Sequence, residues 1–116
     1  MNAYMQKVLD EVKARNEGEE LFLQTVEEVF KSIEPIVEQH PEYEKADLLG
    51  RIVEPERFIQ FRVSWVDDNG KVQVNRGFRV QFNSAIGPYK GGLRLHPSVT
   101  EDTVKFLAFE QTLKNS

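Results

Sequence analysis

The hydrophobic pattern of this chain changes its period at Glu54-Pro55, and this change limits the possible fold more than any other feature. Before it, apolar residues recur at the spacing of amphipathic helices. After it, apolar and polar residues alternate, as in half-buried strands. The pattern predicts helices first, then a β-hairpin and mixed sheet with a following helix. We therefore expect an α/β protein of the α+β type.

Two amphipathic helices are expected before His40, separated by a break at Asn16-Glu17-Gly18. Pro35 lacks a backbone N–H, so we expect it to kink or restart the second helix. His40-Pro41 closes this region, and a short helix is expected over residues 46–53. The apolar stripes of the two helices are Met5, Val8, Leu9 and Val12, and then Phe22, Val26, Val29, Phe30 and Ile33.

A hairpin is expected over residues 57–82, where two alternating runs flank Asp68-Asn69-Gly70. Asn-Gly supplies the positive φ angles of a type I′ turn, so we expect a tight turn there. Gly77 interrupts the second run and is interpreted as the site of a bulge. The apolar residues of the runs are Ile59, Phe61, Val63 and Trp65, and then Val72, Val74, Phe78, Val80 and Phe82.

A last helix is expected near the end of the chain, capped by Ser98 or Thr100. Glu101 and Asp102 then occupy its first turn, where the helix dipole favours negative charge. No terminating glycine or proline follows, so the chain is expected to stop within a longer protein. The expected apolar face contains Val104, Leu107, Ala108 and Gln111, widened by Phe106, Phe109 and Leu113.

Composition excludes several classes of function. The 116 residues are enough for one domain, and the absence of cysteine removes disulfides and thiolate chemistry. Residues 1–53 carry 6 Lys or Arg against 12 Asp or Glu, whereas residues 54–97 carry 7 against 4. A locally basic region in an acidic protein suits small anions better than nucleic acid. No metal site, membrane segment or secretory signal is indicated, and a cytoplasmic location fits.

Two lysines are candidates for binding a ligand with two carboxylates. Lys90 precedes Gly91-Gly92, where glycines let backbone N–H groups approach a ligand. Lys114 follows Gln111 by three positions, so both side chains project from one side of a helix. Taken alone, however, such a lysine is more often a solvated residue of a surface turn or of a last helical turn. Spacing alone therefore favours a solvated lysine at both positions over a ligand-binding one.

Longer stretches of the chain resemble the hexameric glutamate dehydrogenases of the Glu/Leu/Phe/Val dehydrogenase family. The resemblance is carried by residues 81–99, which include Gly87-Pro88-Tyr89-Lys90-Gly91-Gly92, and by residues 105–116. The hairpin sequence of residues 57–72 and His40-Pro41-Glu42-Tyr43 resemble the same family. The match covers essentially the whole chain, and its combination of motifs is far more specific than any one of them.

The resemblance implies a function and a role for each of four residues. These enzymes interconvert L-glutamate with 2-oxoglutarate and ammonium, using NAD or NADP. Lys90 matches the lysine that holds the side-chain carboxylate of the substrate, and Lys114 matches the lysine that holds the α-carboxylate. The resemblance also places Gln111 beside Lys114 at the α-carboxylate, and it implies that the backbone of Gly91 approaches the substrate closely. The resemblance also implies a homo-oligomer, a hexamer when intact, and no nucleic-acid or membrane partner.

The resemblance also implies which parts of the enzyme are missing. The catalytic lysine and aspartate of the family, and its dinucleotide-binding domain, are expected beyond Ser116. Residues 1–116 would then be an incomplete N-terminal part of the substrate-binding and oligomerisation domain. This piece alone is expected to be inactive. An alternative is a non-catalytic assembly or binding module built on the same fold.

Overall fold

The structure is a computed structural model that describes residues 1–85, 88–89, 91, 93–94 and 99–114. Five helices and one antiparallel pair of strands are found within these ranges, which confirms the α+β class. The expected mixed sheet is represented there by this pair alone. The elements are α1 (Ala3–Arg15), α2 (Glu20–Gln39), α3 (Pro41–Lys45), α4 (Leu48–Ile52), β1 (Arg57–Val66), β2 (Val72–Gln81) and α5 (Glu101–Lys114).

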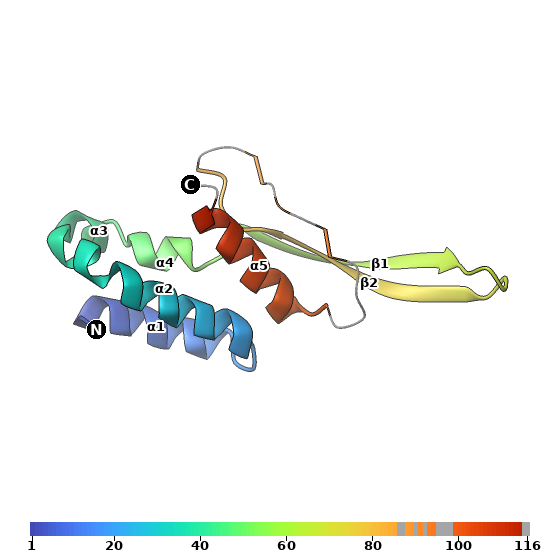
Figure 1. The fold of residues 1–116 in the computed structure, drawn as a ribbon, viewed down its shortest axis with the longest axis horizontal. Coiled ribbons are helices and arrows are strands. Elements are labelled where there is room, and N and C mark those ends of the chain that lie inside the picture. Colours follow the sequence, from blue (N-terminus) through green and yellow to red (C-terminus); the bar gives the residue numbers. More distant parts are fainter. Residues whose placement is uncertain (86–87, 90, 92, 95–98, 115–116) are drawn as a thin grey trace.

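The first two helices lie side by side and bury the predicted stripes against each other (Figure 1). Asn2 caps α1 by accepting a hydrogen bond from the N–H of Met5 at 2.9 Å. Helix α2 continues through Pro35 as a single helix. The expected restart of the helix at this residue is therefore wrong. The end of α2 before Pro41 is confirmed, but two short helices, α3 and α4, follow where one was expected. No helix in the described ranges is both long and apolar enough to cross a membrane.

The hairpin projects from the helical body and gives the molecule its length of 60 Å (Figure 1). Its strands pair without interruption from Arg57↔Gln81 to Val66↔Val72, so the expected bulge at Gly77 is absent. Gly77 instead makes room for the aromatic ring of its partner Phe61. A β-carbon at this position would lie 2.2 Å from Cε2 of Phe61. The glycine thus leaves space for the ring on the opposite strand, and its backbone needs no positive φ.

The turn of the hairpin differs from the expected type I′ turn. Positive φ occurs at Gly70 (75°) and not at Asn69. The N–H of Gly70 donates to the carbonyl of Asp67, and the N–H of Asp67 donates to the carbonyl of Lys71, both at 3.0 Å. The Asp67 carboxylate accepts further hydrogen bonds from the N–H groups of Asn69 and Lys71. These bonds favour a wider turn with a single left-handed residue.

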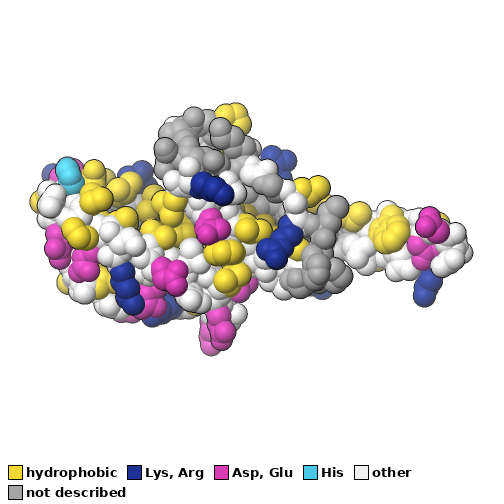
Figure 2. Space-filling view, in the orientation of Figure 1, with side chains coloured by type: hydrophobic (Ala, Val, Ile, Leu, Met, Phe, Trp, Pro, Cys, Tyr) yellow, Lys and Arg dark blue, Asp and Glu magenta, His cyan; other side chains and the backbone are white. Residues whose placement is uncertain are grey.

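The outer half of the hairpin leaves apolar side chains exposed on both faces, because successive residues of a strand point to opposite sides. Figure 2 shows hydrophobic side chains at the surface of this projecting part. Their exposed fractions range from 40% to 65%. One face holds Phe61, Val63 and Trp65, and the other holds Val66, Val72 and Val74.

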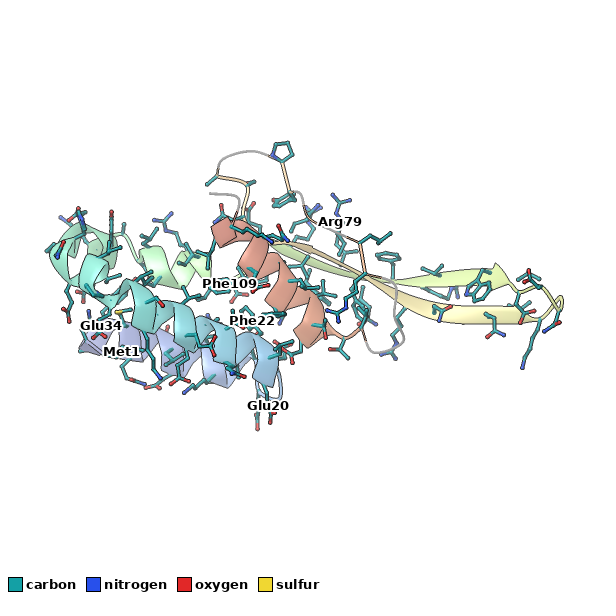
Figure 3. The ribbon with its side chains drawn as sticks, in the orientation of Figure 1. Met1, Glu20, Phe22, Glu34, Arg79 and Phe109 are labelled. Carbon is teal, nitrogen blue, oxygen red and sulfur yellow. The ribbon has the colours of Figure 1, made fainter. Side chains whose placement is uncertain are left out.

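The core joins the helices to the base of the hairpin through three aromatic rings. Phe109 of α5 packs edge-to-face on Phe22 of α2, with ring centroids 5.8 Å apart (Figure 3). Phe82, just after β2, lies 5.5 Å from the ring of Phe109 and 6.1 Å from that of Phe22. Such separations are favourable for aromatic pairs. All three side chains are buried, so α2, α5 and the hairpin share one core.

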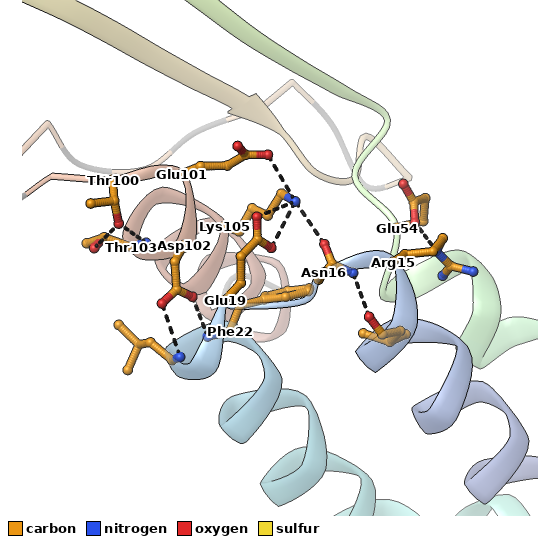
Figure 4. Close-up of polar contacts among 12 residues, drawn as sticks. Arg15, Asn16, Glu19, Phe22, Glu54, Thr100, Glu101, Asp102, Thr103 and Lys105 are labelled. Carbon is orange, nitrogen blue, oxygen red and sulfur yellow. Dashed lines mark hydrogen bonds and ion pairs between the residues drawn. The ribbon is translucent and has the colours of Figure 1, made fainter.

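A buried lysine fixes the start of α5 to the turn between α1 and α2 (Figure 4). The ammonium of Lys105 donates to Asn16 Oδ1 at 2.8 Å and to both carboxylate oxygens of Glu19 at 3.0 Å. Glu101 adds an ion pair at 3.2 Å. Burial raises the pKa of Glu19, and the Lys105 ammonium offsets part of that rise. The sequence analysis did not predict a buried lysine on this helix.

Asp102 provides a second connection between the same elements. Its carboxylate accepts hydrogen bonds from the N–H groups of Leu21 at 3.1 Å and Phe22 at 2.7 Å. These N–H groups belong to the first turn of α2, whose own preceding residue, Glu19, forms no capping bond with its side chain. An acidic residue of α5 therefore caps α2 across a gap of about 80 residues in the sequence.

Replacing Gly77→Ala should lower the free energy of unfolding by about 1 kcal/mol, because the new methyl group displaces the ring of Phe61. Urea unfolding of the 116-residue chain measures the change. The matched control is the same substitution in a Phe61→Leu background, where the shorter side chain leaves room and the cost should be smaller. Equal costs in both backgrounds would show that the ring is not the reason for glycine.

Replacing Lys105→Met should lower the free energy of unfolding by about 3 kcal/mol, because it leaves the half-buried Glu19 and the buried Asn16 without their donor. Chemical denaturation measures the loss. Lys13→Met is the matched control, since Lys13 pairs with Glu27 only at 3.9 Å and both side chains are exposed. The idea fails if the two variants lose similar stability.

Candidate functional site

Helix α5 presents two of the four expected substrate-binding residues, Gln111 and Lys114. Thr100 caps the helix, as predicted, by accepting a hydrogen bond from the N–H of Thr103 at 3.3 Å. The other candidate cap, Ser98, lies outside the described residues. The buried face of α5 passes through Lys105 and Phe109, whereas the residues expected to form it are half-buried (Val104, Leu107, Ala108 and Gln111). The helix therefore turns Gln111 partly toward solvent.

Gly91 and Gln111 lie close together in space although 20 positions separate them in the sequence. A β-carbon at Gly91 would lie 3.4 Å from Cγ and 4.0 Å from Cδ of Gln111, which is van der Waals distance. The backbone of the glycine-rich segment thus approaches the side chain of Gln111 closely. This proximity brings together two residues that the sequence analysis selected separately.

Lys114 lies one helical turn further along α5 and lines a hollow of about 560 Å³ between α2 and α5. Its neighbours there include Ser32 and Glu28 of α2 and Glu110 of α5. The side chain is exposed and forms no ion pair with another described residue. Gly91 does not line this hollow.

Lys90, the fourth expected residue, lies outside the described residues. Its neighbours on both sides are described: Tyr89 precedes it and Gly91 follows it. The proposed pairing of Lys90 with a carboxylate is therefore untested by the geometry.

The segment before Lys90 is held by a carboxylate that the sequence analysis did not select. Glu56, at the foot of β1, accepts a hydrogen bond from the hydroxyl of Tyr89 at 2.6 Å. It also accepts one from the N–H of Ser84 at 2.6 Å and contacts the Ser84 hydroxyl at 3.0 Å. These bonds hold the pKa of the Glu56 carboxyl below its ordinary value, and the contact with Glu56 raises the pKa of Tyr89. No short motif marks such a long-range contact.

The described residues contain neither a metal site nor the parts of a dinucleotide site. No group of three or more His, Asp or Glu among them could hold a metal ion. Their only sheet is one antiparallel pair, whereas a dinucleotide fold needs parallel strands with a glycine-rich turn leading into a helix. The residues present therefore do not fit NAD or NADP. What they can provide is a set of polar and cationic groups for a small anion.

Comparison with known proteins agrees with this arrangement. The family model described as Glu/Leu/Phe/Val dehydrogenase, dimerisation domain, matches residues 55–116, which span the hairpin, the glycine-rich segment and α5. The NAD-specific glutamate dehydrogenase of Clostridium symbiosum is 59% identical over 116 residues, which is 100% of this chain and 26% of that protein. The NADP-specific enzyme of Helicobacter pylori is 54% identical over 113 residues, covering 97% of this chain and 25% of that protein.

Solved structures show the same backbone. A glutamate dehydrogenase structure with 58% identity superposes with a TM-score of 0.94, covering 98% of this chain and 25% of the other. Plasmodium falciparum glutamate dehydrogenase 2 superposes with a TM-score of 0.90 at 47% identity, covering 97% of this chain and 24% of the other. This chain thus spans about a quarter of the length of its relatives. It belongs to the Glu/Leu/Phe/Val dehydrogenase family, and its residues 55–116 match that family's dimerisation domain.

Proposed function

We propose that this chain is the N-terminal part of an NAD(P)-dependent glutamate dehydrogenase. In the intact enzyme it would supply the substrate's carboxylate-binding residues and contacts between subunits. The observation that carries the proposal is the proximity of Gly91 to Gln111, which places the glycine-rich segment beside the helix that bears Lys114. The high identity to glutamate dehydrogenases over the whole chain supports it.

In this proposal Lys90 binds the distal carboxylate of glutamate and Lys114 binds its α-carboxylate, with Gln111 beside it. Charge-assisted hydrogen bonds at both ends would hold the reacting carbon in a fixed position. The nicotinamide cofactor accepts or donates the hydride, and the groups that bind it belong to a domain outside this chain. Relatives named NAD-specific and NADP-specific are equally similar, at 59% identity each. A segment without a dinucleotide site should not resemble NAD-specific enzymes more than NADP-specific ones.

The assembly proposed for the intact enzyme is a homo-oligomer, a hexamer as the family resemblance implies. Two features of this chain support contacts between copies. The matched family model is described as a dimerisation domain, and the hairpin within it exposes apolar side chains on both faces. An exposed strand edge can also pair with another chain.

Replacing Lys90→Ala in the full-length enzyme should raise KM for glutamate by about ten- to a hundredfold, since a charged hydrogen bond to the distal carboxylate is lost. Selection against norvaline, which lacks that carboxylate, should weaken. Steady-state kinetics with both substrates provide the measurement. Lys7→Ala, at an exposed position of α1, is the control. Unchanged discrimination between glutamate and norvaline would remove Lys90 from its proposed role.

Replacing Lys114→Ala should impair glutamate and norvaline alike, by about ten- to a hundredfold in kcat/KM, because both substrates share the α-carboxylate. The same two assays measure the effect. If one substrate were spared, Lys114 would not be the residue that binds the α-carboxylate.

A further inference from the structure

The carboxylate of Glu56 joins two points of the segment that leads from β2 to Lys90. Its Oε1 accepts the hydrogen bond from Tyr89, and its Oε2 accepts the one from the N–H of Ser84. The backbone adds a third connection, because the N–H of Glu56 donates to the carbonyl of Phe82 at 3.2 Å. The beginning and the end of residues 84–89 are thereby held on one side chain.

This use of Glu56 differs from that of the neighbouring acidic residue. Glu54 forms an ordinary surface ion pair with Arg15 at 3.2 Å. Glu56 is also exposed, but it forms no ion pair within the described ranges, and its side-chain hydrogen bonds there lead to Ser84 and Tyr89. Hydrogen bonds to an ionised acceptor are stronger than neutral ones. The carboxylate is therefore positioned to hold this segment and not to balance a surface charge.

The held segment continues directly into the candidate site. Tyr89 and Gly91 are separated by one residue, and Gly91 lies against Gln111. Tyr89 is thus bound through its hydroxyl to Glu56, which directly precedes β1, whereas Gly91 lies beside α5. The residues before and after position 90 are therefore attached to different elements of the fold.

We propose that Glu56 is a positioning residue for substrate selection, which acts through Tyr89 and Ser84 on the backbone that carries Lys90. The inference rests on the proposed function, in which Lys90 binds the distal carboxylate of glutamate. Glu56 itself does not touch the substrate in this proposal. Loss of its contacts loosens the segment, so the enzyme loses affinity for the distal carboxylate while it keeps its affinity for the α-carboxylate.

The test uses Tyr89→Phe and Glu56→Gln in the full-length enzyme. Tyr89→Phe removes only a hydroxyl, and Glu56→Gln replaces one accepting oxygen with a donor that faces other donors. Each variant should lower the ratio of kcat/KM for glutamate to that for norvaline by about three- to tenfold. The double variant should equal Glu56→Gln alone, because both substitutions break one contact. Glu54→Gln is the matched control and should keep the ratio of the unsubstituted enzyme.

Lys90→Ala, measured in parallel, separates failure of this inference from failure of the proposed function. If Lys90→Ala leaves the substrate ratio unchanged, the proposed carboxylate role fails, and the inference fails with it. If Lys90→Ala lowers the ratio but Tyr89→Phe keeps it within about twofold, the positioning role is overturned and the proposed function stands. An equal loss with both substrates, together with a lower melting temperature, would also overturn it, because it indicates a purely structural contact. If Glu56→Gln does not fold, the substrate ratio of Tyr89→Phe alone decides whether the positioning role stands.

Discussion

The buried ammonium of Lys105 is the interaction on which the arrangement of this chain depends. It brings α5 onto the turn between α1 and α2 through Asn16 and Glu19, while Asp102 caps α2 from the same helix. A buried charge is costly unless it is paired, so this arrangement tolerates few alternatives. The position of α5, and with it that of Gln111 and Lys114, follows from these contacts.

The segment between the hairpin and α5 is in turn held from both directions. Glu56 anchors it near the foot of β1, and Gln111 meets it at Gly91. The aromatic core of Phe22, Phe82 and Phe109 keeps these two supports at a fixed separation. Site geometry here is thus set by the packing of helices and hairpin, with the loop itself contributing few internal bonds among the described residues.

Periodicity predicted the elements well, because burial of one face repeats along a helix or a strand. The stripe from Met5 to Val12, the paired strands and the cap at Thr100 are confirmed on this basis. The glycine pair and the helical spacing pointed to Gly91 and Gln111, the resemblance implied their roles, and the structure brings them together. Periodicity could not reveal Glu56 or Lys105, whose partners lie 28 to 89 positions away. For Lys105, only the Glu101 four positions earlier was a visible signal. Gly77 was misread as a bulge because its reason, the ring of Phe61, lies on the other strand.

The two-faced exposure of the hairpin has a consequence for assembly. A ribbon with Phe61 and Trp65 on one face and Val72 and Val74 on the other cannot be covered by a single flat surface. A single neighbouring subunit with a flat surface would cover one face of the hairpin and leave the other exposed to solvent. Complete burial therefore requires a neighbour that wraps around the ribbon, or two separate neighbours. Until that happens, each newly made copy exposes apolar surface of the kind that promotes aggregation.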